Sequence, residues 1–238
     1  MSRELLLLST TTIHGSTFLE YCIDVVTEHF AGIDEILFVP YARPSGISHD
    51  EYTELVRGKL AAVNIKVKGI HELDDIENQL NDYKGIYIGG GNTFLLLKQL
   101  YENNLIASIR KRVKGGKMRY MGSSAGTNVA CVTINNTNDM PIVYPPSFEA
   151  LGLVPFNINP HFLDPDPNSK HKGETRETRI NEFHTQSDIP VVGLREGSWL
   201  KISGNDISLG GALSARMFRK GINTVEMYGH EDLNFLLS

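Results

Sequence analysis

Cysteine is scarce in this chain, and long apolar runs are absent from it. Only Cys22 and Cys131 occur, far apart and outside any CxxC pair, so we expect two packed thiols and neither a disulfide framework nor a thiolate metal site. No stretch approaches the ~20 apolar residues that a membrane-spanning helix needs. The run Leu5–Leu8 is too short for a signal-peptide core and leads into polar residues, which predicts a buried first strand and a cytoplasmic protein.

Positive charge is also in short supply. The chain has 23 Lys and Arg against 28 Asp and Glu, a formal net charge of −5, and its longest basic run is Arg110-Lys111-Arg112. We therefore expect no nucleic-acid partner, because a phosphate backbone is bound by clustered cations. With 41% hydrophobic residues the composition is that of a globular protein, and a single α/β domain can use all 238 residues.

The first half of the chain alternates short apolar runs with helix-length amphipathic segments. The runs, each bounded by Gly, Pro or Asn, are residues 5–8, 36–39, 65–70, 86–88 and 118–121. The expected helices are 16–30, 49–63, 93–101 and 105–113, the last ending at Gly115-Gly116. This alternation predicts an α/β fold with a mostly parallel sheet flanked by helices.

The pattern changes after about Val132, where prolines interrupt the periodicity. Residues 161–172 are typical of an exposed loop, and a helical pattern resumes over 174–184. Three short runs follow at 191–194, 199–202 and 207–209, separated by glycine-containing turns. We expect these runs to form a C-terminal antiparallel extension of the sheet.

One segment has the pattern of a nucleophile elbow. An apolar strand leads into Gly122-Ser123-Ser124-Ala125-Gly126, and a helix opens after it. A Gly-x-Ser-x-Gly turn lifts one hydroxyl above the sheet edge, with small neighbours that let strand and helix approach. Ser124 is therefore a candidate nucleophile, and the N–H of Ala125 is a candidate oxyanion donor. A β–α turn of small residues without chemistry is the alternative.

A second glycine cluster, Gly89-Gly90-Gly91-Asn92-Thr93, also joins an apolar strand to a helix. It has neither the dinucleotide nor the P-loop spacing of glycines. In a parallel sheet this loop lies on the same edge as Ser124, so Gly90 or Gly91 is a candidate second oxyanion donor. Asn92 or Thr93 can also act as the N-cap of the helix.

A serine nucleophile needs a base and a carboxylate. Of eight histidines, His161 is the best candidate, because it follows Pro160 at the end of an apolar run, and His171 is second. The histidines at 29, 71 and 184 fall in surface-like helical or turn segments. Glu196 and Asp139 are both candidates for the carboxylate that orients the base, and the sequence does not rank them by distance.

At this point the chain strongly resembles the peptidase E (α-aspartyl dipeptidase) family of serine peptidases over nearly its whole length. The resemblance rests on six ordered motifs: Leu5-Leu6-Leu7-Leu8-Ser9, Gly89-Gly90-Gly91-Asn92-Thr93-Phe94, Ser124-Ala125-Gly126, Thr137-Asn138-Asp139-Met140-Pro141-Ile142-Val143, Asn159-Pro160-His161-Phe162 and His171-Lys172-Gly173-Glu174-Thr175-Arg176-Glu177. It implies a fold like that of class I glutamine amidotransferase domains, Ser124 as nucleophile and His161 as base. It also implies Glu196 as the orienting carboxylate, with Asp139 as a second essential acid.

The resemblance further implies small peptide substrates with an N-terminal aspartate and no metal or other cofactor. A buried substrate carboxylate needs a cation with paired donors, for which Arg176 is our choice, with Lys172 and Arg179 as alternatives. Asn92 is a second candidate substrate contact. An aspartate-rich storage polymer, as cleaved by cyanophycinase, or a non-catalytic binding role is the alternative function, and a homodimer is compatible with the sequence.

Two residues depart from the family pattern. Ser123 stands where the family commonly has Trp, and Arg195 stands where it commonly has Pro. We expect Ser123 to reshape the leaving-group side of the pocket and Arg195 to add a charge near His161.

Overall fold

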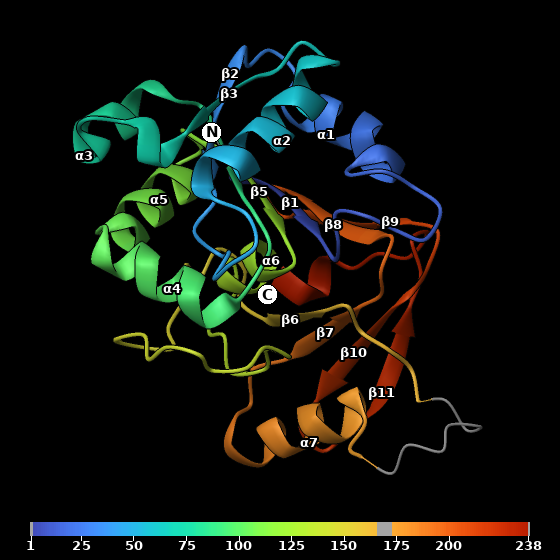
Figure 1. Cartoon of the computed structure of the whole chain (residues 1–238). Coiled ribbons are helices and arrows are strands. Elements are labelled where there is room, and N and C mark those ends of the chain that lie inside the picture. The colour runs from blue at the N-terminus through green and yellow to red at the C-terminus, as the bar shows by residue number, and fades with distance from the viewer. Residues whose placement is uncertain (1, 166–172, 238) are drawn as a thin grey trace.

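A computed structural model of the chain describes residues 2–165 and 173–237. Its larger sheet has seven strands in the order β3-β2-β4-β5-β1-β8-β9 (Figure 1). The strands are β1 (Glu4–Leu8), β2 (Glu35–Val39), β3 (Lys66–Gly69), β4 (Gly85–Ile88), β5 (Arg119–Ser123), β8 (Ser198–Ser203) and β9 (Asp206–Gly211). The first five are parallel, β8 pairs antiparallel to β1, and β9 pairs antiparallel to β8 at the sheet edge. The predicted mostly parallel sheet is confirmed, whereas the expected relation to glutamine amidotransferase domains stays a prediction.

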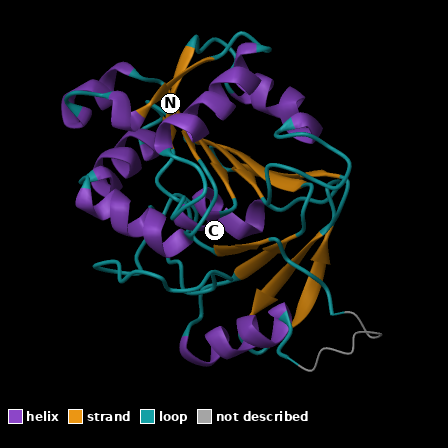
Figure 2. Cartoon of the chain, viewed as in Figure 1, coloured by secondary structure: helices purple, strands orange, loops and turns teal. Residues whose placement is uncertain are grey.

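Helices cover both faces of this sheet (Figure 2). Leu6 and Leu8 of β1 pack in one apolar cluster with α1 (Ile23–His29) and α2 (His49–Ala61). Leu5 and Leu7 point to the other face, where they join the cluster that contains α4 (Thr93–Glu102) and α5 (Leu105–Lys114). Because alternate side chains of a strand face opposite sides, a strand covered on both faces must be apolar throughout. This explains the uninterrupted run Leu5–Leu8, whose residues are all fully buried.

A second sheet of four strands carries part of the site. Its order is β11-β10-β7-β6, with β6 (Asn157–Pro160), β7 (Val191–Leu194), β10 (Ala215–Arg219) and β11 (Ile222–Met227). The prediction that 191–194 belongs to an antiparallel extension of the large sheet was wrong, because β7 pairs parallel to β6 and antiparallel to β10. Strand β10 was not predicted, because Arg216 and Arg219 interrupt its apolar pattern. Helix α7 (Arg176–Gln186) contacts β10, and lies below this sheet in Figure 1.

The remaining elements are short. They are η1 (Glu20–Cys22), η2 (Ile70–Glu72), α3 (Ile76–Gln79), η3 (Leu80–Asp82), α6 (Ala125–Val129) and η4 (Asn234–Leu237). The helix expected over 16–30 begins only at Ile23, because the preceding residues form turns and Leu19 has a φ of 55°. Within the described residues, no helix combines the length and the apolar character that crossing a membrane requires.

Candidate active site

Ser124 lies at the tip of a strained turn between β5 and α6. Its backbone has φ 52° and ψ −111°, outside the regions that residues with a side chain normally adopt. The turn depends on Gly126, since a Cβ on that residue would lie 2.0 Å from the carbonyl oxygen of Ile88. The N–H of Ser124 donates to the carbonyl of Leu8 at 3.2 Å, which fixes the turn to the end of β1. The geometry is that of the predicted elbow.

Three predicted residues form a continuous hydrogen-bonded chain. His161 Nε2 lies 2.9 Å from Ser124 Oγ, and His161 Nδ1 lies 2.6 Å from Glu196 Oε1. His161 follows β6 directly and Glu196 follows β7, so the second sheet places both opposite the elbow. With a carboxylate on Nδ1, the imidazole carries its proton there and Nε2 is left to accept the serine proton.

Asp139, the other candidate carboxylate, binds the start of α4 and not His161. Its Oδ2 accepts the backbone N–H of Thr93 at 2.7 Å, at the first residue of α4. A carboxylate at this position satisfies a free helix N–H and meets the positive end of the helix. Glu196, and not Asp139, is therefore the carboxylate that bonds to His161.

The glycine loop lies against the nucleophile. A Cβ built on Gly90 would lie 3.0 Å from the Cβ of Ser124. The N–H of Gly90 donates to the hydroxyl of Tyr52 at 3.1 Å, so Gly90 is not free to bind an oxyanion. In residues 2–165 and 173–237, the N–H groups of Gly91 and Ala125 have no acceptor. These two N–H groups are left as candidate oxyanion donors.

Tyr52 is a site residue that sequence reasoning missed. It comes from α2, is fully buried, and its hydroxyl meets both the N–H and the carbonyl of Gly90. Burial raises the pKa of Tyr52, so the phenol stays protonated. A tyrosine inside an amphipathic helix gives no local sign of such a contact, which depends on the packing of α2 against Phe38 of β2.

Arg176 is the first residue of α7 and is half-buried. Burial lowers its pKa, as does nearby Arg179, whereas Asp139 acts in the opposite direction. No hydrogen bond or ion pair joins Arg176 to another residue in the part of the chain that the structure describes. Arg179 is more exposed and lies 3.7 Å from Glu174. Lys172 and His171, the other candidates, lie outside the described residues.

Asn92 makes its contacts within the protein. Its side-chain oxygen accepts the N–H of Leu95, and its side-chain nitrogen donates to the carbonyl of Met140. These bonds make Asn92 the N-cap of α4 and tie it to the distant segment that contains Met140. The arrangement favours the cap over the expected substrate contact.

The two residues that depart from the family pattern both make contacts within the protein. Ser123 is fully buried and its hydroxyl bonds to Tyr87 at 2.9 Å, so its side chain does not itself line a surface, and its effect on the leaving-group side stays a prediction. Arg195 pairs with Asp164 and Glu226 and is only 14% exposed. Its charge is therefore matched by carboxylates instead of facing His161.

Two other histidines are buried, not surface residues as predicted. His29 Nε2 lies 3.1 Å from the carbonyl of Tyr120, and His184 Nε2 lies 3.0 Å from that of Ile189. Burial lowers the pKa of His29 to about 3, so this ring is neutral and structural.

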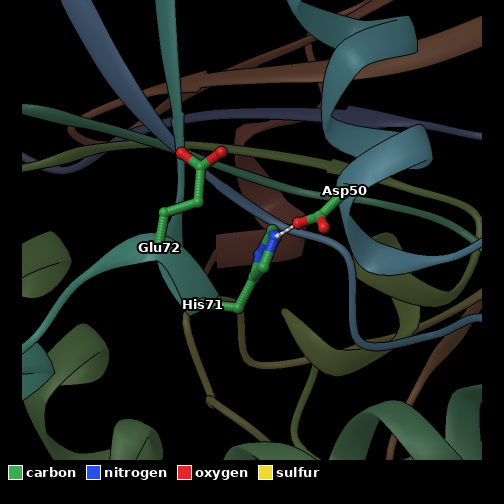
Figure 3. A group of neighbouring side chains, drawn as sticks. All are labelled: Asp50, His71 and Glu72. Carbon is green, nitrogen blue, oxygen red and sulfur yellow. Dashed lines mark hydrogen bonds and ion pairs between the residues drawn. The ribbon is translucent and has the colours of Figure 1, made fainter.

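Among the described residues one group has the spacing of metal ligands: Asp50, His71 and Glu72 (Figure 3). His71 Nε2 lies 2.8 Å from Asp50. Glu72 instead binds Arg57 with both oxygens, at 3.0 and 3.1 Å, and accepts the N–H of Gly69. The carboxylate of Glu72 is therefore neutralised by Arg57, and both of its oxygens already accept hydrogen bonds. We describe this group as an ion-pair cluster and not as a metal site.

The fold and the hydrogen-bonded serine, histidine and glutamate define a serine-type hydrolase of α/β architecture. The chain belongs to peptidase family S51, whose family model matches residues 5–210. It is 52% identical to the peptidase E of Streptomyces coelicolor, over 98% of this chain and 95% of that protein. It is 47% identical to a probable alpha-aspartyl dipeptidase of Drosophila melanogaster, over 99% and 98%. The resemblance found in the sequence is confirmed.

Two solved structures share the fold at 20% sequence identity. A putative peptidase E from Listeria monocytogenes superposes with a TM-score of 0.68 over 90% of this chain and 100% of that one. A peptidase from an acI-B1 actinobacterium superposes with a TM-score of 0.71 over 98% and 97%.

Proposed function

We propose that this chain is a dipeptidase that releases the N-terminal aspartate from Asp-X dipeptides through an acyl-enzyme. The observation that carries the proposal is the contact chain from Glu196 through His161 to Ser124, at 2.6 and 2.9 Å. Two further findings support the proposal. The chain belongs to family S51, and its relatives include proteins named peptidase E and probable alpha-aspartyl dipeptidase.

The first half of the reaction forms an ester. His161 Nε2 takes the hydroxyl proton of Ser124 while Oγ attacks the aspartyl carbonyl carbon, and Glu196 stabilises the imidazolium. The N–H groups of Gly91 and Ala125 bind the oxyanion of the tetrahedral intermediate. His161 then gives its proton to the leaving amine as the C–N bond breaks.

The second half releases aspartate. A water loses a proton to His161 and attacks the ester carbon, and the proton returns to Ser124 Oγ as the ester bond breaks. The half-exposed side chains of His161 and Glu196 leave the reacting atoms open to water. No step calls for a metal, and we expect a chelator to leave turnover unchanged.

Selectivity for the aspartate side chain is assigned to Arg176. A half-buried guanidinium without a partner among the described residues can bind a carboxylate with two parallel N–H donors. Arg179 lies on the same helix but is exposed and paired with Glu174, so it is the matched control. We also propose that residues 1–238 act as one catalytic domain. The two free cysteines support a cytoplasmic location. The homodimer stays a prediction.

The test is kinetics on Asp-Leu, Glu-Leu and Asn-Leu beside an aspartate-rich polymer. We expect Asp-Leu to be preferred, and Ser124→Ala to lower kcat by about 10⁴-fold or more. Arg176→Met is expected to raise KM for Asp-Leu by roughly 10- to 100-fold and to erase its advantage over Asn-Leu, while Arg179→Met stays near wild type. Turnover by Ser124→Ala, preference for the polymer, or a Ser124 that a fluorophosphonate does not label would each contradict the proposal.

A further inference from the structure

Ser9 is a fully buried polar residue that follows β1 directly and has no part in the chemistry above. Its hydroxyl donates to the carbonyl of Leu194 at 2.8 Å and accepts the backbone N–H of His161 at 2.9 Å. Leu194 is two residues before Glu196. One side chain therefore joins the backbone of the base to the strand end that carries its carboxylate.

The backbone around Ser9 extends these contacts to the rest of the triad. The carbonyl of Leu8 accepts the N–H of Ser124 at 3.2 Å. The N–H of Ser9 donates to the carbonyl of Ser198 at 3.1 Å, two residues after Glu196. Two consecutive residues at the end of β1 thus bond to the main chain at or beside all three triad members.

His161 needs such support because its backbone is strained. Its φ is 53°, in the left-handed region that only a few per cent of non-glycine residues adopt. An N–H at a turn of this kind cannot continue the pairing of β6 with β7, and the buried hydroxyl of Ser9 supplies the acceptor it lacks. Without that acceptor the peptide between Pro160 and His161 would keep, among the described residues, only the bond from Asn138 to its carbonyl, at 3.0 Å, so the orientation of the imidazole would be less tightly fixed.

We propose that Ser9 is a positioning residue that aligns His161 between Ser124 and Glu196 by fixing the main chain of the second sheet to the elbow. The inference rests on the proposed function. The nucleophile belongs to the larger sheet, whereas the base and its carboxylate follow strands of the smaller one. Ser9 is a side-chain link between the two sheets at the point where their residues react.

Ser198 offers a matched control. It is also a fully buried serine, and its hydroxyl donates to one backbone carbonyl, that of Leu213, at 2.8 Å. Within the described part of the chain, this hydroxyl has no hydrogen bond to a triad residue. Ser9→Ala and Ser198→Ala each remove one buried hydroxyl, so a loss of stability alone would affect the two variants alike.

The experiment compares Ser9→Ala, Ser9→Thr, Ser9→Cys and Ser198→Ala in the full chain. Because small misplacements of reacting groups cost up to about 10²-fold, we expect Ser9→Ala to lower kcat by about 10- to 100-fold with KM changed less than about threefold. Ser9→Thr, which keeps the hydroxyl, should recover most of the loss, and Ser198→Ala should keep kcat while its Tm falls. In proton NMR, the downfield His161 Nδ1–H resonance should move in Ser9→Ala and stay in Ser198→Ala.

Labelling of Ser124 by a fluorophosphonate separates this inference from the proposed function. If wild type is labelled but does not cleave Asp-Leu, the substrate proposal fails and the labelling rates still test Ser9. If Ser9→Ala does not fold, Ser9→Cys carries the test, with slower labelling than wild type expected from its weaker hydrogen bonds. Labelling and kcat of the Ser9 variants within about threefold of wild type, or an equal loss in Ser198→Ala, would overturn the assignment.

Discussion

The guanidinium of Arg195 binds both carboxylate oxygens of Asp164, at 2.7 and 2.9 Å. Arg195 precedes Glu196, and Asp164 lies three residues after His161, so the ion pair joins the segments that carry the two partners of the nucleophile. Glu226 of β11 binds the same guanidinium, and Ser214 accepts from it. Where the family commonly has a proline, this chain has an ion-pair cluster beside its triad. We call this cluster of Arg195, Asp164 and Glu226 the clamp.

The clamp predicts a dependence of stability on pH. The hydrogen bond from Arg195 lowers the pKa of Asp164, and partial burial opposes it only in part. For Glu226 burial acts to raise the pKa, but hydrogen bonds from Arg195 and Ser214 outweigh it and the pKa is lowered. A lowered pKa in the folded state means stability that is present above the ordinary carboxyl range and lost as the pH falls through the lowered values.

Replacing Arg195 with Met should remove that contribution. Because Asp164 is 48% exposed and solvent screens the pair, we expect a loss of only about 1–2 kcal/mol at pH 7, well under the value for a fully buried pair. The difference from wild type should shrink as the pH falls below about 4. Chemical denaturation from pH 7 to pH 3 measures it. Lys201→Met, which breaks the exposed pair with Glu28, serves as control and should change stability by less than about 0.5 kcal/mol. A difference that grows in acid would contradict the assignment.

The two acidic candidates should separate in their kinetics. Glu196→Gln leaves His161 without a charged partner on Nδ1 and should lower kcat by about 10²- to 10⁴-fold with little change in KM. Asp139→Asn keeps an oxygen for the N–H of Thr93 and removes only the charge near Arg176, so kcat should fall by less than about tenfold. Initial rates on Asp-Leu decide between them, and a larger kcat loss in Asp139→Asn would assign the orienting role to Asp139.

Tyr52 and Tyr87 provide a matched pair of buried phenols. Tyr52→Phe leaves the N–H of Gly90 without its acceptor and should lower kcat by about three- to tenfold as the glycine loop shifts. Tyr87→Phe loses a bond to Ser123 below the elbow. Both should lose about 1–2 kcal/mol of stability, whereas only Tyr52→Phe should slow turnover. Equal turnover in the two variants would show that Tyr52 does not support the loop.

Local patterns were enough to predict the larger sheet and the elbow. Leu5–Leu8 must be apolar on both faces, and Gly122 and Gly126 are required wherever a strand turns this sharply into a helix, so both features are visible in a few consecutive residues. His161 could also be predicted, because a proline and an apolar run place it at the end of a strand.

Contacts between distant segments could not be predicted in this way. The choice of Glu196 over Asp139 depends on the parallel pairing of β6 with β7, which no local period encodes. The role of Tyr52 depends on where α2 packs. The second sheet depends on β10, in which Arg216 is neutralised by Glu177 and Glu226 from other elements. Ion pairs and side-chain-to-backbone hydrogen bonds between residues far apart in the sequence cannot be predicted from the apolar pattern of a single strand.

Substitution by alanine should have opposite effects at Gly126, in the elbow, and at Gly58, in α2. In Gly126→Ala the new methyl group would lie 2.0 Å from the carbonyl oxygen of Ile88, which is backbone of the adjacent strand and cannot move aside, so we expect a loss of about 3 kcal/mol or more and no active enzyme. Gly58 is exposed in the middle of α2 with nothing within 4 Å of a Cβ, so Gly58→Ala should gain about 0.5–1 kcal/mol through helix propensity. Thermal unfolding of both variants against wild type measures the two shifts. A stable Gly126→Ala would mean that strand and helix approach less closely than the elbow requires, and the strained conformation of Ser124 would then need another cause.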